Sequence, residues 1–553
     1  MKKTRMPAVL LAAALLFSAC QSGGPSASSN AAPSSSAPAS SAPASSSAAE
    51  SSSQPDESGA PTLEGEHELT VEIFERGVAG QLPADKSFHT DWIRENFAKE
   101  HPNIKLNYMP VPRAQELEKL NILMASKEAP DICVLYNTET LYSYVDQGGV
   151  AELGEAIEKY GPNLQAYLGD SMEYGIFNGK QYALSAKRVN QAKHGSYIRK
   201  DWLDKLGLSV PANMEEFHEA LLAFKEKDPG GLGSETIPFA MNADFSESTW
   251  PISPILDSFT EEMSDEDFYC LPRYMWPGVK EGVRFVNQLF NEGLINVDFP
   301  LDNDKAVYKE LIAQGKVGAF INNTAFPLGN GTDAAITNLQ KNVPGAELIP
   351  MDPFINEARG GKTWKQVYDP TGIYIFVPSF SKSVDAAVVY LDWITRSDNL
   401  FFLHNGVEGE HYEMKDGIPV PLVVPDDNPR KMSPATIDVT LTTNGQDLGD
   451  PELNRKLFSL SYTDPAQQAL YEQEYVLSTK DGYLLPRFDR PIQSQLKYNS
   501  VLKNFETEIL VKSVTAPADQ FDATFDGLIQ EYLTLGAQEV IDEKRVAYQE
   551  MKG

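Results

Sequence analysis

The side chains best suited to metal or nucleophilic chemistry are scattered through this sequence. It has 7 histidines and 3 cysteines, and no HxxxH, HExxH or CxxC pattern brings two of them together. A zinc site is therefore not expected. Gly361-Lys362-Thr363 resembles the end of a phosphate-binding loop, but Asn356 stands where that loop needs its first glycine. No GxSxG nucleophile motif occurs, and Cys133 lies in an apolar run typical of a core strand.

Carboxylates are abundant, with 78 Asp and Glu. A glycosidase needs only two acids at a suitable separation, which sequence spacing does not reveal. A carbohydrate-active enzyme therefore stays open as one interpretation. Because there are only 47 Lys and Arg, the net charge is −31 at pH 7, and such a field repels the phosphates of nucleic acids. Nucleic acid is not expected as a partner.

The elements that would position a site alternate between strands and helices. Residues 69–74, 104–108 and 131–136 have the composition of strands, and residues 88–99 and 116–125 have the apolar periodicity of helices. This order predicts an α/β fold built from βαβ units around a parallel sheet. At 553 residues, the chain is expected to form two or three domains. Further strands are predicted at 317–322 and 373–378, and further helices at 384–395 and 521–534.

Polar and aromatic residues follow three of these predicted strands. Arg76 comes after the first, Tyr136 and Asn137 come after the run at 131–135, and Asn322 and Asn323 come after the run at 317–321. Ligands of open parallel sheets bind beyond the carboxyl ends of the strands. These five residues are therefore predicted ligand contacts.

The N-terminal 62 residues have the pattern of an exported and anchored protein. Residues 1–19 combine a basic start with a nine-residue apolar run, which is typical of a signal peptide and too short to span a bilayer. Phe17-Ser18-Ala19-Cys20 resembles the lipobox of bacterial lipoproteins, although Leu usually stands in place of Phe17. The resemblance implies that Cys20 is lipidated and anchors the protein at the extracellular face of the cell membrane. The rest of residues 20–62 is rich in Ser, Ala and Pro and predicts an unfolded tether.

Four separated strings, in order along the chain, resemble the extracellular solute-binding lipoproteins of ABC importers, of the carbohydrate type and family 1-like. They are residues 178–184 (NGKQYAL), 197–206 (YIRKDWLDKL), 405–411 (NGVEGEH) and 521–540 (FDATFDGLIQEYLTLGAQEV). The resemblance implies a two-lobed periplasmic-binding-protein-like fold of type II, with a ligand cleft between lobes joined by hinge strands. Lobe one would span 68–184 plus 378–484 and lobe two 185–377 plus 485–553, with crossings near 183–187, 375–379 and 484–487.

The same resemblance implies a function. The protein would capture a small-molecule solute, preferably an oligosaccharide, by hinge closure and deliver it to ABC permease subunits. It would act as a monomer, without catalysis, cofactor or metal. Two alternatives stay open: a secreted carbohydrate-active enzyme, and a binder of peptides or of another organic solute on the same fold.

A sugar site would combine aromatic rings for the CH faces with charged and amide groups for the hydroxyls. Three tryptophans are assigned to packing, on apolar helix faces or within the string at 197–206: Trp92, Trp202 and Trp393. Three others lie in loop-like stretches with Pro or Gly nearby and are predicted solute contacts: Trp250, Trp276 and Trp364. Arg188 and Arg199, which flank the first crossing, complete the predicted site.

Residues 228–235 resemble a calcium loop found in some relatives. Gly230 and Leu232 stand where two oxygen ligands are needed. A turn between a helix and a strand is therefore the prediction for this segment.

Overall fold

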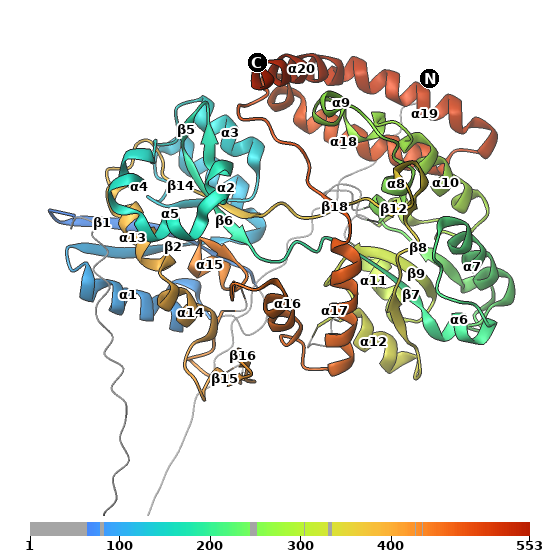
Figure 1. Ribbon diagram of the computed structural model, residues 1–553, viewed down its shortest axis with the longest axis horizontal. Coiled ribbons are helices and arrows are strands. Elements are labelled where there is room, and N and C mark those ends of the chain that lie inside the picture. Colours follow the sequence, from blue (N-terminus) through green and yellow to red (C-terminus); the bar gives the residue numbers. More distant parts are fainter. Residues whose placement is uncertain are drawn as a thin grey trace, which may run out of the picture. The chain divides into compact units, whose positions relative to one another are not determined.

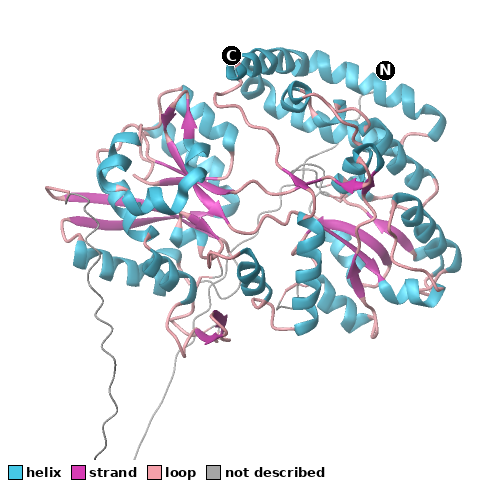
Figure 2. Cartoon of the chain, viewed as in Figure 1, coloured by secondary structure: helices cyan, strands magenta, loops and turns pink. Residues whose placement is uncertain are grey.

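The computed structural model describes residues 63–77, 82–243, 251–302, 305–329, 334–425, 427–433 and 435–553. The predictions for the signal peptide, for Cys20, for the tether and for Trp250 lie outside these residues. The described chain contains two four-stranded sheets, each with helices around it (Figure 1, Figure 2). No described helix combines the length and the apolar content that a bilayer-spanning segment needs.

The first sheet has the strand order β17-β6-β14-β3, and the parallel pair of β1 and β2 lies beside it. The sheet contains β3 (Cys133–Leu135), β6 (Ala183–Arg188), β14 (Thr371–Phe376) and β17 (Thr443–Asn444), and the pair consists of β1 (His67–Glu75) and β2 (Ile104–Pro112). Val71 of β1 forms a parallel bridge with Ile132, which leads into β3. The predicted parallel pairing thus holds for β1 to β3. It is wrong for β14, which is antiparallel to both β3 and β6 because the chain returns to this sheet from the opposite direction.

Helices cover the first sheet on the residues that the apolar periodicity selects. They are α1 (Phe88–Glu100), α2 (Glu116–Ser126), α3 (Thr138–Asp146), α4 (Gly154–Tyr160), α5 (Pro162–Leu168), α13 (Val384–Thr395), α14 (Ser397–Asn405) and α15 (Ile437–Thr440). α1 and α2 begin where predicted, and α13 has the predicted bounds. Trp393 of α13 is buried in the core that contains Ile375 and Leu184, and Trp92 packs against that core. The packing roles predicted for these two tryptophans are confirmed.

The second sheet has the strand order β10-β7-β9-β8. Its strands are β7 (His194–Arg199), β8 (Ile237–Ala240), β9 (Val317–Asn323) and β10 (Leu348–Pro350). Its helices include α6 (Lys200–Leu206), α7 (Met214–Lys227), α8 (Ser253–Phe259), α9 (Asp265–Cys270), α10 (Val279–Asn291), α11 (Ala306–Ala313) and α12 (Ala335–Asn342). Trp202 is fully buried in this core, edge-on to Phe224, so its predicted packing role is confirmed.

The chain's last helices extend the second core. α18 (Gln493–Thr515), α19 (Phe521–Tyr532) and α20 (Gln538–Lys552) follow one another, with a kink at Leu533–Ala537 between α19 and α20. α18 packs along α10, and apolar residues of all three helices join the core around Val283. The predicted helix at 521–534 therefore ends at Tyr532, because Gly536 takes a non-helical conformation with φ of 124°.

Short segments connect the two sheets, and hydrogen bonds hold these segments together. Residues 189–193 lead from β6 to β7, and the Gln191 carbonyl accepts a 3.0 Å bond from the backbone N–H of Tyr368, which precedes β14. The backbone N–H of Val367 donates to the Tyr483 carbonyl at 3.0 Å. Tyr483 ends β18 (Gly482–Tyr483), which pairs in parallel with β13 (Lys365–Gln366). The connections are thus one bonded bundle of backbone.

The expected lobe boundaries need two corrections. β14 was assigned to lobe two, within 185–377, but it pairs with β3 and β6 in the first sheet. The expected lobe one includes α17 (Pro465–Thr479), but α17 packs on β7 and β10 of the second sheet, whereas α16 (Pro451–Ser459) contacts α17 and β16 (Ile418–Pro421). The physical reason is the burial of Tyr471, which lies in a core shared with Tyr197.

Candidate functional site

The strand ends of the first sheet carry the predicted polar residues, and each has a local partner. Arg76 donates from Nε and Nη2 to the two carboxylate oxygens of Asp438, at 2.7 and 2.6 Å. These bonds raise the pKa of Arg76 above its ordinary value. Tyr136 lies against Phe74 and under the guanidinium of Arg113, which is 4.2 Å from its ring centroid. This edge is held rigidly by charge pairing and stacking.

Asn137 begins α3 and also faces a groove. Its Oδ1 accepts hydrogen bonds from the backbone N–H and the hydroxyl of Thr140, at 2.7 and 2.8 Å. An asparagine in this position satisfies a free N–H at the start of the helix, which accounts for part of the sequence signal. Asn137 also lines two of the three cavities that form this groove.

Three adjoining cavities form a groove between α3 and the C-terminal helices. Their volumes are about 410, 340 and 530 Å³, and Glu139 lines all three. Tyr142 of α3 faces the first cavity, whose other walls include Trp276, Arg273 and Arg487. Because three cavities adjoin, and because both polar and aromatic side chains line them, the groove can contact several units of an extended polar ligand.

An aromatic cluster supports one wall of the first cavity. Trp276 is only 4% exposed, and its Nε1–H donates to the Leu271 carbonyl at 3.0 Å. Trp364 stacks on Tyr483, with centroids 3.9 Å apart and planes at 17°, and the guanidinium of Arg359 lies 3.7 Å from the Trp364 centroid. Trp276 lines the first cavity although little of it is exposed, whereas the ring of Trp364 is stacked between Tyr483 and Arg359.

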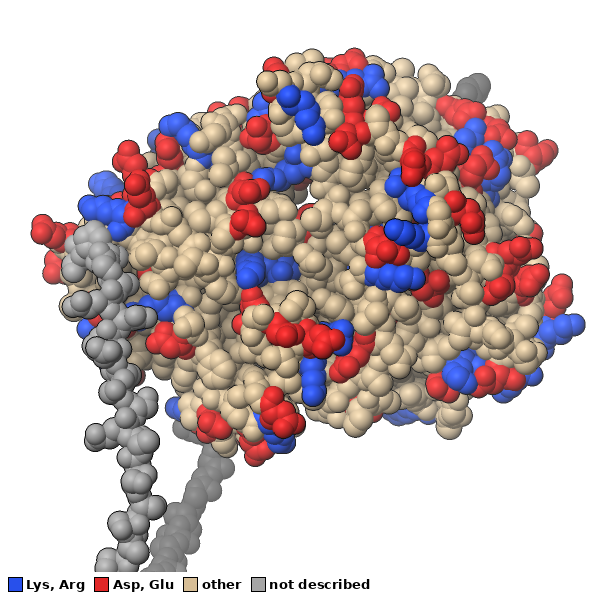
Figure 3. Space-filling view, in the orientation of Figure 1, with Lys and Arg blue, Asp and Glu red and all other residues tan. Residues whose placement is uncertain are grey.

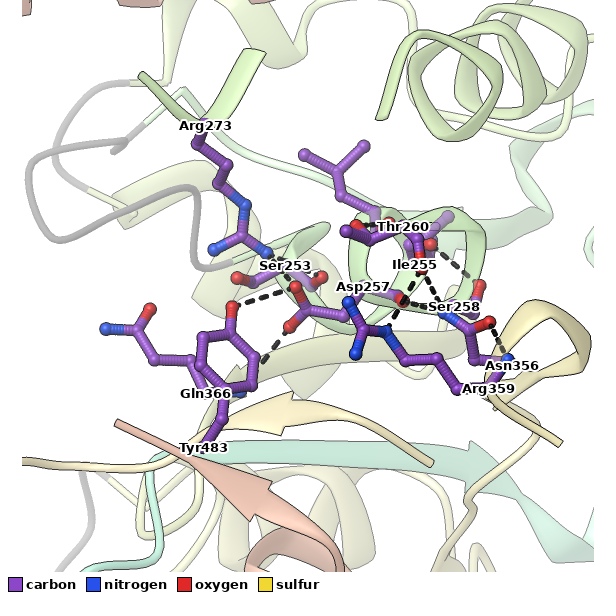
Figure 4. Close-up of polar contacts among 11 residues, drawn as sticks. Ser253, Ile255, Asp257, Ser258, Thr260, Arg273, Asn356, Arg359, Gln366 and Tyr483 are labelled. Atoms are coloured by element: carbon purple, nitrogen blue, oxygen red, sulfur yellow. Dashed lines mark hydrogen bonds and ion pairs between the residues drawn. The ribbon is translucent and has the colours of Figure 1, made fainter. Parts of the chain in front are cut away.

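A buried carboxylate fixes the arginine beside this wall (Figure 4). Asp257 Oδ1 accepts from Arg273 Nη2 at 2.6 Å and from the hydroxyl of Tyr483 at 3.0 Å. Burial raises the pKa of Asp257, and Arg273 and Tyr483 act against that rise. Arg273 also donates to the Ser253 carbonyl at 3.1 Å. The network locks the Arg273 side chain in place where it lines the groove.

A further cavity of about 380 Å³ lies beside the connecting segments and brings two predicted residues together. The Arg188 guanidinium lies 4.3 Å from the ring centroid of Tyr368, and Asn323 Nδ2 donates to the Tyr368 hydroxyl at 2.8 Å. Arg188 Nε also donates to the Thr371 carbonyl at 2.9 Å. Tyr368 thus links a strand end of the first sheet with a strand end of the second.

Two predicted residues lie inside the second lobe's core region. Arg199 is 1% exposed, and its Nε and Nη2 both donate to Asp201 at 2.8 Å. Its Nη1 donates to the Gly315 carbonyl at 3.1 Å. We leave Arg199 out of the proposed site, because its guanidinium is buried and already bonded. Asn322 is also 1% exposed, and its Nδ2 has no hydrogen-bond partner among the described residues.

Sequence reasoning missed several residues that line the groove or support it. They are Glu139, Tyr142, Arg273, Gln366, Tyr483 and Arg487. Tyr142 lies one helical turn beyond the α3 cap, a position that the search at strand ends did not cover. Arg273 is three residues before Trp276, so the loop-like stretch around Trp276 is the sequence signal that could have located it.

The described residues contain no group of three or more His, Cys, Asp and Glu placed to hold a metal ion. In the loop that resembles a calcium site, the Asp228 carboxylate accepts from the backbone N–H groups of Leu232 and Gly233, at 2.9 and 2.8 Å. It also accepts from the hydroxyl of Thr236 at 2.8 Å. The loop joins α7 to β8 and is closed by these bonds.

The fold is that of two-lobed solute-binding proteins. The alginate-binding protein AlgQ2 has a TM-score of 0.60 at 20% identity, over 88% of this chain and 99% of that chain. The substrate-binding protein FusA of Streptococcus pneumoniae, solved with kestose, has a TM-score of 0.60 at 16% identity, over the same shares. The predicted periplasmic-binding-protein-like fold is confirmed.

The chain belongs to the bacterial extracellular solute-binding protein family, whose model matches residues 79–400. Lipoprotein LipO of Bacillus subtilis is 26% identical over 63% of this chain and 68% of its own length. The polygalacturonan/rhamnogalacturonan-binding protein YtcQ of the same organism is 26% identical over 56% of this chain and 61% of its own length. The family resemblance predicted from the four strings is confirmed.

Proposed function

We propose that this protein is the extracytoplasmic substrate-binding subunit of an ABC importer and that it binds an oligosaccharide. The observation that carries the proposal is the groove, whose first cavity is lined by Trp276, Tyr142 and Arg273 and whose adjoining cavities are lined by Asn137 and Glu139. Rings stack on the CH faces of sugars, and fixed donors pair with hydroxyls. No catalytic step is part of this function.

Named relatives support the carbohydrate class. YtcQ is a polygalacturonan/rhamnogalacturonan-binding protein, FusA is a fructooligosaccharide ABC transporter substrate-binding protein, and MelE is a melibiose/raffinose/stachyose-binding protein. Their names differ in the sugar but agree in its polymeric or oligomeric nature. A groove formed by several cavities fits a ligand of that length.

The proposed contacts lie in two groups. The groove group contains Asn137, Tyr142, Arg273 and Trp276, and the hinge group contains Arg188, Asn323 and Tyr368. We propose hinge crossings at 189–193, 367–370 and 484–492; the first two are bonded to each other, and Val367 bonds to Tyr483, which precedes the third. A solute that contacts both lobes favours the closed state by its additional contacts there.

The anchor and the partners are proposals of the same kind. Lipidation of Cys20 would hold the protein at the extracellular face of the membrane, and the tether would let its lobes reach the permease. LipO, a relative that matches 63% of this chain, is named a lipoprotein. The protein would act as a monomer, since one cleft is enough for one solute.

Thermal shift with a panel of oligosaccharides tests the binding function directly. A ligand at about 100 times its Kd should stabilise the fold by roughly 2.7 kcal/mol, which raises the melting temperature. Product analysis of the same mixtures separates binding from catalysis. Turnover in excess of the protein would establish the enzyme alternative, and stabilisation only by peptides would establish the peptide-binding alternative.

A further inference from the structure

Three basic side chains surround a single carboxylate beside the connecting segments. Lys193, Arg188 and Arg487 all act electrostatically on Asp369. Asp369 is exposed to solvent, yet desolvation by the surrounding protein raises the pKa of its carboxyl. The three cations act to lower that pKa. Three cations thus act on one carboxylate here, in a protein whose net charge is −31.

Stacking and backbone hydrogen bonds hold two of these cations, Arg188 and Arg487. Arg188 lies over Tyr368 and donates from Nε to the Thr371 carbonyl. Arg487 lies 4.4 Å from the ring centroid of Tyr174 and donates from Nη1 to the Glu173 carbonyl at 2.9 Å. Within the described part of the chain, neither arginine has a carboxylate at ion-pair distance.

Other arginines of the protein show what an occupied guanidinium looks like. Arg76 forms two bonds to Asp438, Arg199 forms two to Asp201, and Arg273 bonds to Asp257. Arg188 and Arg487 keep guanidinium donors available, and each lines a cavity. A planar guanidinium matches the two oxygens of a carboxylate. Their arrangement is suited to an anionic group that enters from the cleft.

Acidic and basic side chains are interspersed over the face seen in Figure 3, and acidic residues outnumber basic ones in the sequence, 78 against 47. An acidic ligand is repelled by the acidic parts of the surface and attracted only where basic groups gather. A neutral sugar can accept hydrogen bonds from these arginines, but only a carboxylate also balances their charge when they lose water on binding.

We propose that the solute is an acidic oligosaccharide and that Arg188 and Arg487 bind its carboxylate groups. This inference rests on the proposed sugar-binding function and specifies its substrate class. Lys193 contributes longer-range attraction in the same region. Asp369 reduces the positive charge around the two arginines when the cleft is empty.

The test uses matched pairs of ligands on the full exported protein. Uronate oligosaccharides of several backbones are compared with their methyl esters, which keep the sugar skeleton and remove the charge, and with neutral oligosaccharides. We expect calorimetry to show that one uronate series binds, that its methyl ester binds at least about tenfold more weakly, and that affinity falls as salt rises. If no sugar of any kind binds, the proposed function fails. If a neutral sugar or the methyl ester binds as tightly as the acid, only the present inference fails.

Variants test the assigned residues. Arg188→Gln and Arg487→Gln should each weaken binding of the acidic ligand about tenfold or more, and Arg188→Lys should weaken it less because the charge remains. Arg545→Gln, on the exposed surface of α20, is the control for loss of one arginine. Melting temperatures without ligand show whether each variant is folded. Unchanged affinity in folded Arg188→Gln and Arg487→Gln would overturn the assignment.

Discussion

The hydroxyl of Tyr483 donates a 3.0 Å hydrogen bond to the same Asp257 oxygen that accepts a 2.6 Å bond from Arg273. The side chain of Asp257 is 1% exposed and that of Arg273 is 14% exposed. Tyr483 ends the strand that pairs with β13, so this contact ties a connecting segment to helix α8 and to the loop before Trp276. One carboxylate thus joins the hinge to the groove wall.

Removal of this carboxylate should be more damaging than removal of its hydroxyl partner. Asp257→Ala leaves Arg273 buried without its counter-charge and should lower the free energy of unfolding by about 3–5 kcal/mol. Tyr483→Phe deletes one hydrogen bond to a charged group and should cost about 1.5–3 kcal/mol. Urea unfolding followed by circular dichroism measures both. Equal losses for the two variants would contradict this role of Asp257.

The Arg76–Asp438 pair should contribute to stability. Asp438 has a side chain only 3% exposed, so Arg76→Ala leaves a buried carboxylate without its partner. We expect the free energy of unfolding to fall by about 3 kcal/mol. Arg94→Ala serves as the control, because its partner Asp91 is 71% exposed and such surface pairs contribute about 0–1 kcal/mol. Comparable melting temperatures for the two variants would refute the prediction.

Trp276 should affect ligand binding, whereas Trp202 should not. Trp276→Phe shortens the ring that faces the groove and removes the donor to the Leu271 carbonyl, so binding of the oligosaccharide should weaken several-fold. Trp202 lies in the second core, so Trp202→Phe should lower the stability of the fold without changing the affinity for the oligosaccharide. Calorimetric titration of both variants at a temperature where both are folded makes the comparison. An equal loss of affinity would argue against direct contact by Trp276.

Acid should destabilise the fold through two buried histidines. Burial lowers the pKa of His89 to about 4 and the pKa of His404 to about 3, from the ordinary 6.5. The unfolded chain therefore binds more protons than the folded chain below pH 6.5, so stability is lost as pH falls toward 4. The loss is on the order of 3 kcal/mol per histidine.

A substitution separates this effect from carboxylate titration. His89 Nε2–H donates to the Leu403 carbonyl at 3.0 Å, and its Nδ1 accepts from the Ser433 N–H at 3.2 Å. His89→Gln does not titrate in this range, so the slope of unfolding free energy against pH between 6.5 and 4 should be smaller. Urea unfolding at several pH values measures that slope. The same slope in wild type and variant would exclude His89 as its source.

Local pattern predicted the elements that form the lobes. The alternating residues of β1 and the apolar periodicity of α1 and α13 depend on neighbours a few positions away, which the sequence displays directly. The packing of Trp92 and Trp393 followed from the same periodicity, and the packing of Trp202 followed from its place in the string at 197–206. The four strings added the family and, with it, the two-lobed arrangement that periodicity does not contain.

The partners of charged groups depended on the tertiary structure. Arg76 and Asp438 are 362 residues apart in sequence, and no local signal links them. Arg199 and Arg188 flank the same crossing, yet one is buried against Asp201 and the other lies over Tyr368 beside a cavity. The direction of β14 was likewise decided by the return of the chain to the first sheet.

The sequence by itself determined the α/β elements and the family, because periodicity and short motifs record short-range geometry. Only the tertiary structure decided which side chains line the groove and which are engaged in ion pairs. Desolvation and ion pairing depend on distance in space, and folding brings together residues that are hundreds of positions apart.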